Sequence, residues 1–389
     1  MVFPGHVPRE RSTRNAAVIS ARKTLALLAA AALAHHAAAQ SFTLISPPAG
    51  QTAAVVNGMS ADGSVIAGYS TNNNDTRSFT WTLAGGRNDI GFSPGFPTFN
   101  GVNAISGNGR AVVGSSSAVL QANSARAFRW SDDGTYQSLG VQGGYGASTA
   151  TGISGDGSVV IGRSYTTQQG AEVAAQAFRW TASGGMQPLG FTRPSSGYST
   201  ASGVSRDGSV VVGTSKTGTQ SDAFRWVSDS GMTVLNGLPG STQSRASAVD
   251  STGSLIVGSC GLNAVLWRNG VPQDLGLALG YQRSSGYGLS EGASVIISNM
   301  QSNSGGILSA GVWTEQTGMI LLEDYLRARG TPIPSTFRLD NVTGISADGQ
   351  TFAGYSVSGS IAYGWVATVP APATALLFVG LLAPRRRPR

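Results

Sequence analysis

Short apolar runs alternate with glycine and small polar residues along most of the chain, and the arrangement returns at a regular interval. The segment GVSRDGSVVVGTS at 203–215 shows it: an Asp-Gly pair precedes a run of β-branched residues and a glycine. An Asp-Gly pair between two apolar runs favours a tight hairpin turn. A continuous β-branched run is typical of a strand buried on both faces. The segment therefore predicts two antiparallel strands joined at Asp207-Gly208.

Six further segments share this pattern, so it is a repeat and not a single motif. Their first residues are Gly58, Ala104, Gly152, Ala248, Gly288 and Gly344, and the copies at 248 and 288 are the most divergent. One repeat position holds the aspartate of the turn, with Asn108 as its equivalent in the second copy: Asp62, Asp156, Asp207 and Asp348. We expect these side chains to cap backbone amides of their own turns.

A second motif, typified by AFRW, follows each copy and contains every tryptophan of the sequence. In AFRWV at 223–227, alternation places Phe224 and Trp226 on one face of a strand and Arg225 on the other. The tryptophans lie 41 to 52 residues apart and are expected to hold one equivalent position in all seven repeats: Trp81, Trp130, Trp180, Trp226, Trp267, Trp313 and Trp365.

Each repeat predicts four short strands, because a further strand follows the tryptophan strand after a glycine turn. Four strands in about 40–50 residues is the period of a β-propeller blade. The sequence thus predicts an all-β, seven-bladed β-propeller over residues 41–368. The seventh repeat lacks its last strand, and the segment that begins at Ser41 is similar to the missing one. We expect 42–46 to pair beside 363–367, which closes the ring and removes its open edges.

One insertion, at 321–341, lengthens the sixth repeat. Its segment LLEDYLRARG has the spacing of a short amphipathic helix, with Gly330 and Pro332 as stop signals. We expect this helix on the rim or a face of the propeller.

The repeat region resembles the HAF family of extracellular repeats, whose units carry G-x-S-x-D-G-x-x-x-x-G and A-F-R-W motifs. The resemblance covers roughly residues 51–368. It implies export from the cell, and it brings no established reaction.

Both ends of the chain have the pattern of targeting signals. Basic residues precede an apolar run at 25–33, and an A-x-A sequence ends at Ala39, which predicts a signal peptide over 1–39. The segment 369–389 joins a Pro-x-Pro pair, a short apolar run and an arginine cluster. The residues that define this pattern are Pro370, Pro372, Arg385, Arg386 and Arg387.

This tail resembles the PEP-CTERM sorting signal of exported bacterial proteins, although Ala371 replaces the usual glutamate and Pro384 interrupts the apolar run. The resemblance implies processing by an exosortase, a membrane transpeptidase-like enzyme. It also implies a place at the cell surface or in the extracellular matrix, with transient or permanent anchoring in the membrane. A degenerate tail or a simple membrane anchor is the alternative.

The formal net charge of +7 comes from the two ends of the chain. Residues 41–368 contain 17 basic and 18 acidic residues, and 17 − 18 gives a net charge of −1. A nucleic-acid-binding protein needs a basic face on its folded body. No nucleic-acid partner is therefore expected, and the protein is expected to be a monomer.

Histidine and cysteine usage narrows the possible chemistry. His6, His35 and His36 all lie in the predicted signal peptide, and Cys260 is the only cysteine. The remaining chain thus lacks the residues for Ser-His-Asp or Cys-His catalysis, for histidine-ligated metals and for an internal disulfide. We predict no catalytic residue, no metal and no cofactor.

Two repeated side chains have a structural and a functional interpretation. The turn aspartates suggest a ring of calcium sites, but each loop offers one carboxylate where calcium takes about six to eight oxygens. Turn capping is the favoured interpretation. Arg129, Arg179 and Arg225 recur before the tryptophan. A ring that binds acidic polysaccharide is one explanation, and contacts between blades are the favoured one.

Three functions follow from these observations. The first is an exported, non-enzymatic propeller that binds an extracellular polysaccharide or protein. The second is a carbohydrate-active propeller that uses paired carboxylates at its central channel. The third is a passive matrix protein without a discrete ligand. Carboxylates outside the repeat pattern are the candidates for the second function: Glu172, Glu291, Glu315, Glu323 and Asp324.

Overall fold

The structure is a computed structural model that describes residues 40–370, except for 73, 119–123, 195, 304–305 and 307. Within it, Gln40–Val369 forms one compact unit. The predicted signal peptide lies outside the described residues. The same holds for the sorting pattern except Pro370, so Pro372, Arg385, Arg386 and Arg387 have no structural description.

The predicted all-β class is confirmed, and the strands fall into seven antiparallel groups. Group 1 contains β2 (Ala53–Met59), β3 (Ile66–Thr71), β4 (Thr76–Thr82) and β5 (Gly86–Asp89). Group 2 contains β6 (Phe99–Ile105), β7 (Ala111–Ser117), β8 (Arg126–Ser131) and β9 (Tyr136–Gly140). Group 3 contains β10 (Ala147–Ile153), β11 (Val159–Gln168), β12 (Ala171–Thr181) and β13 (Gly185–Gly190).

Groups 4 to 6 have the same order. Group 4 contains β14 (Tyr198–Val204), β15 (Val210–Thr217), β16 (Gln220–Val227) and β17 (Gly231–Val234). Group 5 contains β18 (Ser244–Val249), β19 (Leu255–Cys260), β20 (Asn263–Arg268) and β21 (Val271–Asp274). Group 6 contains β22 (Tyr281–Leu289), β23 (Ile296–Ser302), β24 (Leu308–Thr314) and β25 (Gly318–Leu321).

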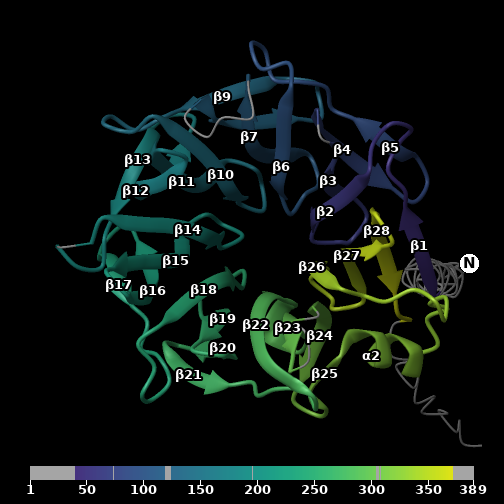
Figure 1. Ribbon diagram of the computed structural model, residues 1–389. Helices are drawn as coiled ribbons and strands as arrows, with labels where there is room; N and C mark the ends of the chain where they lie inside the picture. Colours follow the sequence, from purple (N-terminus) through teal and green to yellow (C-terminus); the bar gives the residue numbers. More distant parts are fainter. Residues whose placement is uncertain are drawn as a thin grey trace, which may run out of the picture. The chain divides into compact units, whose positions relative to one another are not determined.

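Group 7 is assembled from both ends of the compact unit. It contains β26 (Asn341–Ile345), β27 (Thr351–Ser358), β28 (Ile361–Thr368) and β1 (Ser41–Ile45). The pairing expected between 42–46 and 363–367 is confirmed, because Phe42 lies opposite Ala367 and Ile45 lies opposite Gly364. Figure 1 shows β1 beside β28, with the groups following one another around a common centre.

Hydrophobic clusters between neighbouring groups hold this arrangement together. Ile45 is 3% exposed and shares a cluster with Val56 and Ile66 of group 1 and with Val366 of group 7. Single parallel pairs also link groups, such as Ala53 of β2 opposite Ala362 of β28. The first and last parts of the compact unit therefore share one core.

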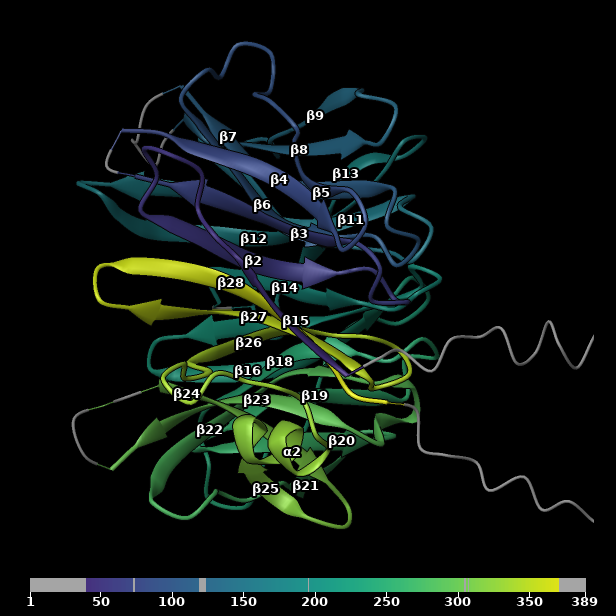
Figure 2. The ribbon, with the colours of Figure 1, turned by 90° about the vertical axis from the view of Figure 1, so that its right-hand side faces the viewer.

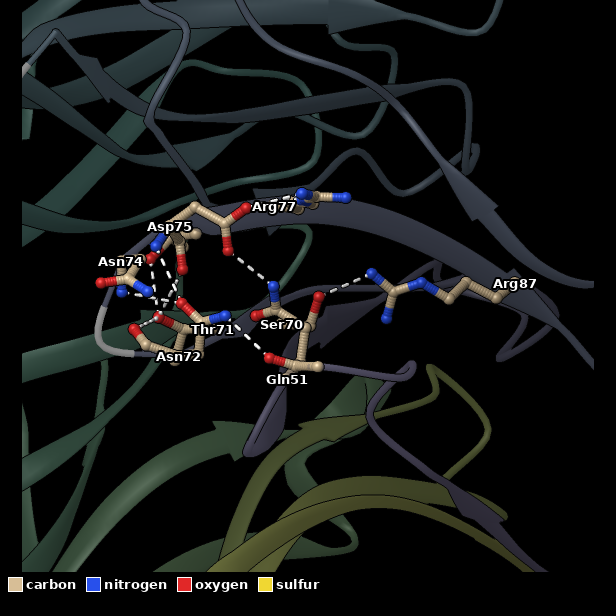
Figure 3. A network of polar contacts seen from close by, with 10 residues as sticks. Gln51, Ser70, Thr71, Asn72, Asn74, Asp75, Arg77 and Arg87 are labelled. Atoms are coloured by element: carbon tan, nitrogen blue, oxygen red, sulfur yellow. Dashed lines mark hydrogen bonds and ion pairs between the residues drawn. The ribbon is translucent and has the colours of Figure 1, made fainter.

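Polar contacts fasten the loop between β3 and β4 to the segment before β2 (Figure 3). Asp75 accepts hydrogen bonds from Gln51 Nε2 at 2.6 Å and from Arg77 Nε at 2.8 Å. Asn72 Nδ2 donates to the carbonyl oxygen of Gly50 at 2.8 Å. The chain between β1 and β2 is thereby fixed at both Gly50 and Gln51.

A glycine in the second strand of a group allows the first strand to approach closely. A Cβ at Gly213 of β15 would lie 2.0 Å from the carbonyl oxygen of Thr200 on β14. Group 6 departs from this rule, since Ser298 replaces the glycine and lies opposite Gly286. In group 4 the residue opposite Gly213 is Ala201. In group 6, the glycine of this pair is therefore on the first strand, β22, and not on the second, β23.

The tryptophan prediction is correct for six positions and wrong for Trp365. In β4, Trp81 lies opposite Ile66, two residues before the close-approach glycine, and the next five tryptophans have the equivalent place. Trp365 instead lies opposite that glycine, Gly354, where Phe79 lies in group 1.

The cause is an exchange of large and small side chains across β27 and β28. Phe352 fills the place of Ile66, and Ala367 lies opposite it where the other groups have tryptophan. Phe352 packs edge-on against Tyr325 at a ring separation of 5.9 Å. The insertion after group 6 thus supplies an aromatic ring that only group 7 has to accommodate.

The expected helix is confirmed as α2 (Leu322–Ala328). It lies beside β24 and β25 (Figure 2). Leu322, Tyr325 and Leu326 enter a core shared with group 7, whereas Asp324 is exposed. In the part of the chain that the structure describes, no helix is long and apolar enough to cross a membrane.

Candidate functional site

The turn aspartates act as hydrogen-bond acceptors within their own turns, as predicted. Asp207 Oδ1 accepts from Ser205 Oγ at 2.6 Å and from the Ser209 amide at 3.0 Å. Gly208 follows with a φ of 74°, a conformation that favours glycine. Asp62, Asp156 and Asp348 make the same pair of contacts. Residues 40–370, as far as they are described, contain no cluster of metal-ligating side chains.

Protonation of these turns is expected to lower stability in acid. Hydrogen bonds from Ser205 and then Ser209 hold the pKa of Asp207 below its ordinary value. The unfolded chain thus binds the proton more tightly. This contribution to stability is complete above the ordinary pKa near 4 and is lost as the pH falls through the lower folded value. The variant Asp207→Asn should show a smaller fall in Tm than the wild type between about pH 6 and pH 2.

Circular dichroism melts over this pH range measure the difference. Asn108, which accepts from Ser106 Oγ at 2.7 Å and from the Arg110 amide at 3.0 Å, shows that the turn accommodates asparagine. An equal fall in Tm for both proteins would contradict the assignment.

The repeated arginines connect neighbouring groups. The Nε atoms of Arg129, Arg179 and Arg225 donate to the carbonyl oxygens of Gly157, Gly208 and Gly253, at 2.9, 3.2 and 3.3 Å. Each acceptor is the turn glycine of the next group. These contacts support the structural interpretation of the three arginines, because their guanidinium groups are directed to backbone.

A cavity of about 950 Å³ is lined by the first strands of all seven groups. Each first strand contains a β-bulge that leaves one residue unpaired in the ladder. All seven bulge residues line the cavity: Asn57, Asn103, Thr151, Ser202, Ser247, Tyr287 and Thr343. The bulges thus direct one polar side chain from every group into the common centre.

Four bulge side chains bind the next group. Asn57 Nδ2 donates to Val102 O and Asn103 Nδ2 to Ala150 O, both at 2.7 Å. Thr151 Oγ1 donates to Ala201 O at 2.7 Å, and Thr343 Oγ1 donates to Val56 O at 2.8 Å. These hydrogen bonds run around the cavity from group 7 through groups 1, 2 and 3 to group 4 and connect each of these groups to the next.

The remaining described lining mixes small aliphatic, polar and aromatic residues, with one charged residue, Arg163. Tyr165, Tyr287 and Tyr355 contribute phenol rings, and no aspartate or glutamate occurs among the described lining residues. Arg163 Nε lies 3.2 Å from Glu172 Oε1, and the Arg163 guanidinium carbon lies 5.4 Å from the Tyr165 ring centre. Among its described residues, this wall offers hydroxyl groups, amides and one guanidinium group but no carboxylate.

Apart from Glu323 and Asp324, which share α2, the candidate carboxylates lie on separate elements. Glu172 pairs with Arg163, Glu315 pairs with Arg268, and Glu323 pairs with Arg327 inside α2. Glu291 accepts from Ser251 Oγ and, with Asp250, lines a smaller cavity of about 210 Å³ beside the turns. None of the five candidates lines the 950 Å³ cavity in the described part of the chain.

The bulge residues were missed by the sequence predictions, although a signal for them exists. A polar residue directly precedes each of the seven repeat copies, from Asn57 before Gly58 to Thr343 before Gly344.

Cys260 does not line the 950 Å³ cavity. It is buried, and its sulfur accepts a hydrogen bond from the Leu238 amide at 3.0 Å.

Comparison with known proteins identifies the fold and not a family. No protein-family model and no curated protein matches the sequence. An oligogalacturonate lyase from Vibrio parahaemolyticus matches in structure with a TM-score of 0.54 and 11% identity, over 85% of this chain and 97% of the lyase. At this identity the likeness shows the fold alone.

Two further enzymes give the same result. A puromycin hydrolase matches with a TM-score of 0.54 and 10% identity, over 84% of this chain and 54% of its own. A prolyl endopeptidase matches with a TM-score of 0.52 and 13% identity, over 83% of this chain. The chain spans about half the length of the endopeptidase, 51%. Together these likenesses show an all-β, propeller-like fold.

Proposed function

We propose that the protein is an exported, non-enzymatic, seven-bladed β-propeller closed by β1, which binds a ligand at the cell surface or in the extracellular matrix. Each strand group would be one blade. The antiparallel order repeated in the seven groups and the pairing of β1 with β28 support this architecture. The export signal over 1–39 and exosortase processing of 369–389 remain proposals from the sequence pattern.

The observation that carries the binding function is the composition of the 950 Å³ cavity. Ligand pockets typically have volumes of about 300–1,000 Å³ and a few convergent polar groups. This cavity has hydroxyl groups, amides and tyrosine rings from all seven groups and no carboxylate among its described lining residues. Such a wall suits recognition of a polyhydroxylated or charged ligand better than acid–base chemistry, which requires a titratable pair.

A carbohydrate-active enzyme is the second candidate, and the smaller cavity is the observation that favours it. Asp250 and Glu291 both line that cavity, as does Ser251, whose hydroxyl group donates to Glu291. Two carboxylates at one opening are the minimum for glycoside hydrolysis. Asp250, however, already accepts from the Ser254 and Leu255 amides at 2.9 and 3.0 Å, which is the role of a turn residue.

One experiment separates the two candidates. The purified protein is incubated with a panel of bacterial and plant polysaccharides and with extracellular proteins, and both retention and product release are measured. The proposal predicts retention of at least one ligand without release of reducing or unsaturated ends. Product release that is lost in Glu291→Gln would establish the enzyme instead. Absence of binding to any member of the panel would leave the passive matrix protein as the better description.

A further inference from the structure

Three of the seven bulge side chains break the hydrogen-bond pattern around the cavity. Ser202, Ser247 and Tyr287, in the consecutive groups 4, 5 and 6, donate no hydrogen bond to a neighbouring group within the described residues. Tyr287 is 50% exposed. Since these hydroxyl groups line the cavity and are not used by the fold, they are available to a ligand.

Two unpaired cations lie on the same side. Lys216 belongs to β15 of group 4 and Arg245 to β18 of group 5. Eight other arginines form ion pairs with carboxylates, whereas neither of these side chains has an ion pair or hydrogen bond in the described structure. Unpaired positive charge therefore lies in the same groups as the unused hydroxyl groups.

Neither Lys216 nor Arg245 is itself among the residues that line the cavity, but the repeat places both at positions whose equivalents in other groups line it. Lys216 stands three residues after the close-approach glycine of its strand, as Tyr165 does in β11, and Tyr165 lines the cavity. Arg245 stands two residues before its bulge residue, as Thr149 and Thr200 do, and both threonines line the cavity.

Lys216 lies close to an aromatic ring and interacts electrostatically with Arg245 and Glu172. Lys216 Nζ lies 4.7 Å from the centre of the Tyr198 ring. Burial lowers the pKa of Lys216, and the nearby positive charge of Arg245 lowers it further. Glu172, which already pairs with Arg163, is the carboxylate that acts on Lys216 in the opposite direction. An anion bound between Lys216 and Arg245 would relieve their mutual repulsion.

We propose that Ser202, Lys216, Arg245, Ser247 and Tyr287, which we call the open sector, bind an acidic oligosaccharide that carries uronic acid carboxylates. This inference rests on the proposed binding function and specifies its ligand class. Lys216 and Arg245 contact the carboxylates, because charge-assisted hydrogen bonds to a carboxylate are about twice as strong as neutral ones. Ser202, Ser247 and Tyr287 hydrogen-bond the sugar hydroxyl groups, and the Tyr198 ring packs against a sugar face.

Calorimetric titration of the full chain tests the proposal with three named probes. These are an oligogalacturonate, a malto-oligosaccharide of the same length, and a polyglutamate peptide of similar charge. We expect the oligogalacturonate to bind, with an affinity that falls as salt is added, and the other two to bind at least about tenfold more weakly. The double variant Lys216→Gln/Arg245→Gln should lose at least about tenfold in affinity.

Arg206→Gln is the matched control. Arg206 is also a cation without an ion pair in the described structure, but it lines the smaller cavity beside the turns. Its replacement should leave binding unchanged. Equal binding of the neutral and acidic sugars, tighter binding of the peptide, or an unaffected double variant would each overturn the open sector as a uronide site. No binding of oligogalacturonate would overturn it too, while a ligand found in the wider panel would leave the proposed binding function intact.

Discussion

Replacing Gly213 by alanine is expected to destabilise the folded protein by at least about 3 kcal/mol. The new Cβ would lie 2.0 Å from the carbonyl oxygen of Thr200 and 2.8 Å from the Phe224 ring. The first neighbour is backbone, so no side-chain rotation relieves the overlap, and β14 and β15 must move apart. Urea unfolding followed by tryptophan fluorescence measures the loss.

Two further variants identify the cause. Gly197→Ala, in the same part of the chain, places its Cβ where no atom lies within 4 Å, and stability should change by less than about 1 kcal/mol. The double variant Ala201→Gly/Gly213→Ser reproduces the pair Gly286/Ser298 of group 6 and should recover only part of the lost stability, because Phe224 stays opposite position 213 where group 6 has Gly311. If Gly213→Ala and Gly197→Ala were equally stable, close strand approach would not be the reason for the glycine.

Deleting Ser41–Ile45 is expected to cost at least about 3 kcal/mol and to promote association of the protein. The deletion removes the fourth strand of group 7 and exposes the hydrogen-bonding edge of β28. It also removes Ile45, which is 3% exposed and fills a cluster between groups 7 and 1. Thermal unfolding measures the loss, and light scattering detects the association.

Point variants within β1 separate side-chain packing from edge pairing. Ile45→Ala should lose about 2–4 kcal/mol, and Leu44→Ala, whose side chain is 41% exposed, should lose less than about 1 kcal/mol. A deletion variant that keeps the wild-type Tm and remains monomeric would show that β1 contributes nothing to the fold.

The sequence pattern predicted the regular part of the fold for a physical reason. Asp-Gly turns and β-branched runs determine local conformation, so the hairpin at Asp207-Gly208 and its relatives follow from residues within a few positions. The pairing of β1 with β28 followed from counting the strands of each repeat. The seventh repeat lacked its fourth strand, and the segment that begins at Ser41 belonged to no repeat. Both predictions required only that every repeat fold alike.

What the sequence could not predict lies where the repeats differ in three dimensions. Trp365 has the motif of its relatives, but it lies opposite Gly354, and Phe352, which fills the place of Ile66, packs against Tyr325 of the insertion. The candidate site depends on which bulge side chains find a neighbour. The bulge side chains that bond to the next group are asparagine and threonine, such as Thr151, and those without such a contact in the described structure are serine and tyrosine, such as Ser202. The sequence alone does not show that a carbonyl oxygen of the next group lies within reach of them.

The pairing of β1 with β28 also constrains the order in which the protein acquires its structure. Ser41 bonds to Thr368, a partner 327 positions away in sequence. A ribosome makes β1 first among the strands and β28 last, so β1 has no native partner while the intervening strands emerge. Groups 1 to 6 contain only consecutive strands and can form as they appear, while group 7 waits for the whole chain. The pairing of β1 with β28 is therefore expected to be the last strand pairing to form, and a truncated nascent chain would present β1 to proteases as an unpaired segment.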